Sequence, residues 1–75
     1  MARWADRERR LRQRLARNVR AQRTQQRLTL EEAAHRGDLH WRHLQKVEAG
    51  ETGVTLRTLA KLALALDVDV SALLA

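Results

Sequence analysis

The sequence contains no cysteine, proline, phenylalanine or tyrosine, and its only aromatic side chains are those of Trp4 and Trp41. Without cysteine, neither disulfides nor thiolate metal sites can reinforce a small core. Strands normally draw on aromatic and β-branched residues, so an all-β domain is disfavoured. No apolar run reaches the roughly 18 residues that a membrane span needs, and the basic start lacks a signal peptide's apolar segment. These absences predict a soluble, intracellular, all-helical protein.

The residues that are abundant support that prediction. Leucine, alanine, arginine, glutamate and glutamine dominate the chain, and all five are strong helix formers. A length of 75 residues allows one small domain. A domain of that size is marginally stable alone, so close helix packing or oligomerisation has to support it.

The net charge of +6 is unevenly distributed along the chain. Residues 1–27 carry ten arginines and two acids, a net of +8, whereas residues 28–75 carry a net of −2. A strongly basic half indicates a polyanionic partner, with nucleic acid the first candidate and an anionic membrane the second. A merely solvated helix surface is the plainer alternative. Arginine dominates the basic residues, and its planar fork suits phosphate groups and guanine edges.

Apolar spacing predicts five helices. The first spans about residues 6–26, with Leu11, Leu15 and Val19 on one stripe. Thr29 caps the second with Glu32 as its capping-box partner. The glycine and aspartate at 37–38 end that helix, since both tolerate left-handed geometry.

The third helix spans residues 41–49. Its inward side chains are expected to be Leu39, Leu44 and Val47, and its outward ones Trp41, Arg42, His43, Gln45 and Lys46. Thr55 caps a fourth helix over residues 56–66, and Asp69 caps a short fifth one. The inward positions of the fourth helix are Leu59, Leu62, Ala63 and Leu66.

The order of short helix, tight turn and short helix over residues 29–48 is that of a helix-turn-helix. The run Thr-Leu-Glu-Glu-Ala-Ala from Thr29, followed by Leu-Gln-Lys-Val-Glu-Ala-Gly from Leu44, resembles the Cro/repressor-type (XRE-type) helix-turn-helix family. The fourth helix and the run Leu-Ala-Leu-Asp-Val from Leu64 are also similar to that family. The resemblance covers residues 15–75, which we expect to form the DNA-binding domain, with residues 1–14 as an Arg-rich N-terminal extension of the first helix.

The resemblance implies an all-α, compact five-helix repressor-like domain that binds a palindromic operator in double-stranded DNA as a homodimer. The helix over residues 41–49 would lie in the major groove. The base-contacting positions would then be Trp41, Arg42, Gln45 and Lys46, and the phosphate-contacting positions Thr29, Thr55 and Arg57. The family also implies a structural ion pair between Arg23 and Glu48. Such a protein would be cytoplasmic and nucleoid-associated.

The chain departs from the family pattern at several places. Leu30 stands where a phosphate-contacting glutamine is common, and Asp38 stands where glycine is usual. The loop over residues 51–53 lacks the basic residue that relatives place on the DNA backbone. We hypothesise that the extra arginines of residues 3–14 compensate for this missing contact.

Other groups of residues give weaker evidence for a function. His35, His40 and His43 are close in sequence, but the turn would separate them and no further ligand completes a metal site. No nucleophile motif or phosphate-binding loop points to an enzyme or a cofactor. Trp41 could contact DNA or fold back over Leu39 and Leu44, and both alternatives stay open.

The leading function is therefore a sequence-specific transcriptional regulator, most simply a dimeric repressor. An antitoxin that also binds a toxin, a restriction–modification controller and a protein–protein adaptor without DNA binding are the alternatives. The apolar side chains at the C-terminal end suggest a dimer interface, or else they complete the core. They are Leu64, Val68, Val70, Leu73 and Leu74.

Overall fold

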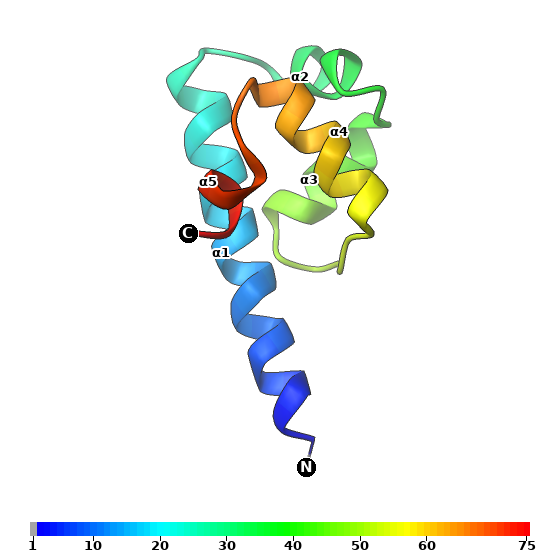
Figure 1. Ribbon diagram of the computed structural model, residues 1–75. Coiled ribbons are helices and arrows are strands. Elements are labelled where there is room, and N and C mark those ends of the chain that lie inside the picture. The colour runs from blue at the N-terminus through cyan, green and yellow to red at the C-terminus, as the bar shows by residue number, and fades with distance from the viewer. Residues whose placement is uncertain (1) are drawn as a thin grey trace.

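The computed structural model describes residues 2–75 and consists of five helices joined by short turns (Figure 1). In chain order they are α1 (Arg3–Gln25), α2 (Leu30–Arg36), α3 (Trp41–Glu48), α4 (Leu56–Leu66) and α5 (Val70–Leu74). Residues 2–75 contain no strand. The predicted all-helical class and the order of five helices are confirmed.

Helix α1 is much longer than the rest and gives the molecule its elongated shape. Its second half packs against α3 and α5, and α2 packs against α3 and α4. Its first half extends beyond the other helices, as the lower part of Figure 1 shows, and the principal extents are 39 × 21 × 19 Å. Residues 2–11 are all exposed. The extension is thus a continuous part of α1 that starts at Arg3, earlier than the sequence pattern predicts.

The core is built mainly from leucine and valine side chains of four helices. The largest fully buried side chains are Val19 of α1, Leu44 and Val47 of α3, Leu62 and Leu66 of α4, and Leu73 of α5. Helix α2 contributes the small side chains of Ala33 and Ala34. The predicted stripe on α1 is correct for Leu15 and Val19 and wrong for Leu11. That side chain is 47% exposed because it lies where α1 begins to leave the body of the domain.

The starts of α2, α4 and α5 follow their predicted caps. The Thr29 hydroxyl accepts a hydrogen bond from the backbone N–H of Glu32, and the Glu32 carboxylate accepts one in return. The Thr55 hydroxyl accepts from the N–H of Thr58, and Asp69 accepts from the N–H of Ser71. The bond from the Ser71 N–H also lowers the pKa of Asp69. Each cap satisfies donors that the first turn of a helix leaves unpaired.

The first four helices end in the same way. Each is followed by a residue at positive φ, namely Arg27, Asp38, Gly50 and Asp67. The next residue then donates its N–H to a carbonyl five residues back, as Leu39 does to Ala34 and Val68 to Ala63. This is the Schellman motif, which pairs carbonyls that a helix end leaves open. Three of the four positions are not glycine, so each carries local strain of about 1 kcal/mol.

Gly37 has a different role from the one its sequence position suggested. Its φ is −97°, and Asp38 takes the left-handed conformation instead. A Cβ atom on Gly37 would lie 2.5 Å from the carbonyl oxygen of Lys61 and 2.9 Å from the Cβ of Ala65. Both atoms belong to α4, so glycine is needed here because α2 ends directly against that helix. Lys61 also donates to the Asp38 carbonyl oxygen over 3.1 Å, which ties the turn to α4.

Gly37→Ala is expected to destabilise the fold by about 1–3 kcal/mol, since the added methyl overpacks backbone that cannot move aside. Gly53→Ala is the matched control, because a Cβ there approaches only the mobile end of Glu8, at 3.4 Å. Urea denaturation followed by circular dichroism measures both. Equal stability of the two variants would show that α2 and α4 are not held this close.

Candidate nucleic-acid interface

Helix α3 is anchored on one side and open on the other. Leu44 and Val47 are each 2% exposed and fix its inner side in the core. Arg42, Gln45 and Lys46 are all exposed, and their spacing of three and four residues places them on one side of the helix. The structure therefore gathers three long hydrogen-bonding side chains into one outward row on a rigid element.

The start of α3 depends on a histidine that the sequence analysis did not identify as a cap. The Nδ1 atom of His40 accepts a hydrogen bond from the backbone N–H of Arg42 over 3.1 Å. The His40 imidazole thereby satisfies one of the donors that the first turn of α3 leaves unpaired. Its position directly before the helix was the available signal, but histidine is not among the usual cap residues.

Trp41 connects this cap to the outward row. Its ring stacks on that of His40, with centroids 5.9 Å apart, and the Arg42 guanidinium lies 5.4 Å from its centroid. The side chain is 36% exposed, so part of it is covered by the domain and part faces solvent. The arrangement holds Arg42 beside a flat aromatic surface. His43, which was expected to face outward, is half-buried instead.

The candidate phosphate contacts lie at two helix starts that differ in charge. At α2, the carboxylate of Glu32 accepts the N–H of Thr29, which lowers the pKa of Glu32, and Glu31 adds a second acid to the first turn. At α4, the first turn has no acidic residue, and both Thr55 and Arg57 are exposed. Since a helix start attracts anions unless an acid already fills it, α4 offers the better phosphate position.

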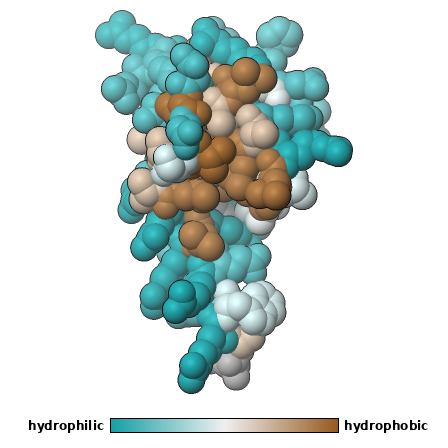
Figure 2. Space-filling view, in the orientation of Figure 1, coloured by the Kyte–Doolittle hydropathy of each residue, from teal (hydrophilic) through white to brown (hydrophobic). Residues whose placement is uncertain are grey.

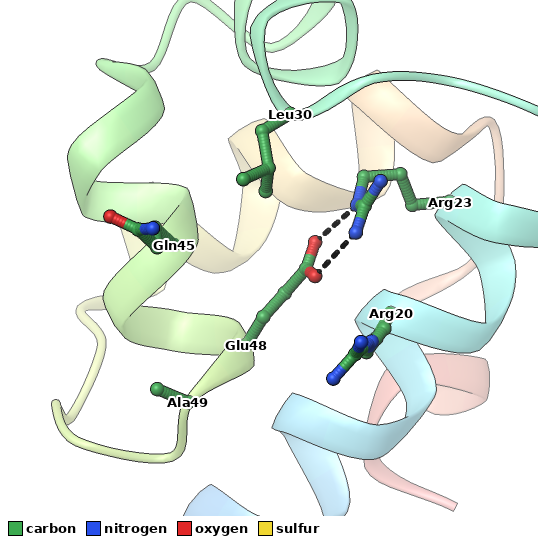
Figure 3. Close-up of a pocket in the computed structure, with 6 residues that line it drawn as sticks. All are labelled: Arg20, Arg23, Leu30, Gln45, Glu48 and Ala49. Carbon is green, nitrogen blue, oxygen red and sulfur yellow. Dashed lines mark hydrogen bonds and ion pairs between the residues drawn. The ribbon is translucent and has the colours of Figure 1, made fainter.

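The ion pair between Arg23 and Glu48 joins α1 to α3 (Figure 3). The Nε atom of Arg23 donates to one carboxylate oxygen over 2.6 Å, and a terminal nitrogen donates to the other over 2.8 Å. The second terminal nitrogen donates to the Leu28 carbonyl oxygen over 2.9 Å. The hydrogen bonds to Glu48 raise the pKa of Arg23, and the two side chains are only 14% and 8% exposed.

A shallow hollow of about 260 Å³ lies beside this pair. It is lined by Arg20, Arg23, Leu30, Gln45, Glu48 and Ala49, which Figure 3 draws. Arg20 is exposed, and the hollow brings it to the side of α1 that faces Gln45. Sequence reasoning did not single out Arg20, because only the packing of α1 on α3 distinguishes it from the other arginines.

The remaining candidates do not form a site. Residues 2–75 contain no group of three or more histidine or acidic side chains placed to hold a metal ion. The Nδ1 atom of His40 is already used by the start of α3. Within the same residues, no helix is both long and apolar enough to cross a membrane.

Comparison with known proteins identifies the fold. A family model described as helix-turn-helix matches residues 19–73, which is more than half of the chain. The chain belongs to the helix-turn-helix family. The resemblance to the XRE-type members of that family is confirmed, and this helix-turn-helix protein is a DNA-binding transcriptional regulator.

This helix-turn-helix protein is also similar to a solved structure. The structure is that of the restriction-modification controller protein C.AhdI from Aeromonas hydrophila, with a TM-score of 0.79 and 31% sequence identity. The similarity covers 83% of this chain and 94% of the controller protein. No curated protein matches the sequence at a significant level.

Glu48→Gln is expected to destabilise the helix-turn-helix domain by about 2–4 kcal/mol, because it leaves Arg23 nearly buried without its counter-charge. Thermal unfolding measures the loss. Glu51→Gln removes the same charge from an exposed position three residues later and should change stability by less than about 0.5 kcal/mol. Similar effects of both substitutions would contradict a structural role for the pair.

Proposed function

We propose that this protein is a dimeric, sequence-specific regulator that reads the major groove of an operator with α3. The outward row of Arg42, Gln45 and Lys46 on a helix anchored by buried side chains is the observation that carries the proposal. Arginine and lysine suit the O6 and N7 atoms of guanine, and glutamine suits adenine. Trp41 would contact a thymine methyl or the groove wall with its exposed part.

Contacts with the DNA backbone would position α3 in the major groove. Thr55 and Arg57 at the start of α4 would contact phosphates, where helix N–H groups and a basic side chain converge. Thr29 would contribute at the edge of the interface, although Glu32 reduces the attraction for phosphate there. In this proposal residues 15–75 form the DNA-binding domain, and residues 1–14 form an extension of it.

A symmetric dimer would use the apolar surface of α4 and α5. Leu56 and Leu64 are 84% and 70% exposed, and their spacing of eight residues places them on one side of α4. Figure 2 shows apolar side chains gathered over these two helices. Leu73 is fully buried and completes the core, whereas Val68, Val70 and Leu74 are half-buried at the edge of this surface. A second copy would cover it and give the two α3 helices a palindromic target.

The regulator would act by binding DNA rather than by catalysing a reaction, at the nucleoid in the cytoplasm. Similarity to C.AhdI, at 31% identity over 83% of the chain, favours a restriction–modification controller as the specific role. A simple repressor and an antitoxin with a toxin partner are the other roles within the same class. Neighbouring genes that encode a restriction enzyme and a methyltransferase would support the controller role, and a neighbouring toxin gene would support the antitoxin.

Arg42→Ala and Lys46→Ala are each expected to weaken binding to the selected operator by about 1–3 kcal/mol, because each removes a base contact. Operator sequences are obtained by selecting bound duplexes from a random pool, and the affinity for them is measured at fixed salt. Arg3→Ala is the control, since it removes one charge from the far end of α1. Equal losses on operator and random DNA would show that these residues contact phosphates and do not read bases.

Leu64→Glu is expected to shift the protein from dimer to monomer at micromolar concentration, because it buries a charge in the proposed interface. Sedimentation velocity measures the change against the 8.7 kDa mass of one chain. Ala21→Glu adds the same charge at an exposed position of α1 outside this surface and should leave the dimer intact. A wild-type protein that sediments only as a monomer would contradict the proposed interface.

A further inference from the structure

Over residues 3–17, one side of α1 consists of arginine. Arg3, Arg7, Arg10, Arg14 and Arg17 follow one another at alternating spacings of four and three residues, and all five are exposed. At 100° and 1.5 Å per residue, they fall within an arc of about 80° and extend along about 21 Å of helix. We call these five side chains the arginine stripe.

The arginine stripe faces away from the side of α1 that contacts α3. Arg23 pairs with Glu48 of α3, and Arg20 lines the hollow beside that pair. A Cβ on Gly50, just after α3, would lie 3.9 Å from the Cβ of Ala16. Ala16, Arg20 and Arg23 lie about 100–160° around the helix from the centre of the stripe. A duplex bound to the outward row of α3 therefore leaves the stripe uncovered.

The charges of the stripe are poorly balanced within the domain. In the described part of the extension the acidic residues are Asp6 and Glu8. Asp6 pairs with Arg9 and Arg10, and only Arg10 belongs to the stripe. Glu8 lies on the opposite side of α1, near Gly53. Like charges three and four residues apart destabilise a helix, and the stripe contains four such neighbouring pairs. An external polyanion would remove this repulsion.

The stripe presents a row of cations of the kind that a nucleic-acid backbone binds. The axial step between successive arginines averages about 5 Å, and a DNA strand offers one phosphate per about 3.4 Å of helix axis. Arg7, Arg10 and Arg14 also surround a shallow hollow of about 350 Å³ with Leu11. Guanidinium groups bind phosphate oxygens in pairs of hydrogen bonds. The stripe thus offers a row of five guanidinium groups that can each bind a phosphate.

We propose that the arginine stripe binds the phosphate backbone of a second DNA segment while α3 holds the operator. The protein then bridges two duplexes, or two distant parts of one DNA. The part of this inference that concerns binding of the operator by α3 rests on the proposed function. Binding of the stripe to random-sequence DNA is independent of what α3 reads, which keeps the two proposals experimentally separate.

The first experiment measures bridging. Selected operator duplex is fixed to beads and saturated with protein at 0.15 M salt, and a labelled duplex of unrelated sequence is added. The wild-type protein is expected to retain the labelled duplex at least about fivefold above protein-free beads. A variant with all five stripe arginines changed to glutamine, a strong helix former, is expected to lose this retention. Its operator affinity should stay within about threefold, because exposed charges beyond about 8 Å are screened at this salt.

A control for the side of the helix changes Arg9 and Arg20, which lie on the α3 side of α1, to glutamine. This control should weaken operator binding and leave the retention per bound protein unchanged. Circular dichroism checks that each variant keeps its helix content. The proposal is overturned if the wild type holds the operator but retains no second duplex. It is also overturned if the stripe variant loses operator binding as strongly as retention, since the stripe then contacts the operator itself.

The second experiment does not need an operator. The Arg42→Ala/Lys46→Ala variant is titrated with random duplex over a range of salt, with and without the stripe substitutions. Removing the stripe is expected to reduce the slope of log K against log salt by up to about 4.5, which corresponds to five phosphate contacts. An unchanged slope would show that the stripe binds no DNA, as expected if its partner is an acidic protein. Failure to select any operator would contradict the proposed function and leave this measurement intact.

Discussion

The ion pair between Arg23 and Glu48 is the interaction on which the rest of the domain depends. One guanidinium joins three parts of the chain, because it donates to Glu48 at the end of α3 and to the Leu28 carbonyl just before α2. A carboxylate that is 8% exposed needs this partner, since an unpaired buried charge is strongly destabilising. Leu44 and Val47 bury the inner side of α3, and the pair determines its orientation against α1. The outward row of α3 is therefore presented at a fixed angle.

The same packing divides α1 into two parts with different roles. The second half supplies Leu15, Val19 and Arg23 to the core and to the ion pair. The first half extends beyond the other helices and carries six arginines within residues 3–14. Phosphate contacts provide affinity that depends on salt, whereas base contacts provide sequence information. The net of +8 in residues 1–27 is therefore suited to phosphate contacts, and the side chains that we propose to read bases lie in residues 28–75, which carry a net of −2.

Features determined by neighbouring residues were predictable from the sequence. The caps formed by Thr29, Thr55 and Asp69 and the bounds of α4 follow from groups within a few residues of each other. The predictions were wrong where a distant element decides the outcome. Leu11 is exposed because no helix covers the start of α1, and Gly37 is required because a Cβ there would lie within 3 Å of atoms of α4. No local pattern contains that information.

The sequence alone determined the helical class, the order of the five helices, the family and the outward positions of Arg42, Gln45 and Lys46 on α3, because periodicity and capping are local properties. The tertiary structure decided which arginines share a surface with α3. It placed Arg23 in the ion pair, Arg20 beside Gln45 and the stripe on the opposite side of α1. It also separated Leu73, which completes the core, from Leu64, which remains exposed. These outcomes depend on how the helices pack. Two arginines or two leucines are the same in the sequence, and only the neighbouring helices decide which of them is buried, paired or exposed.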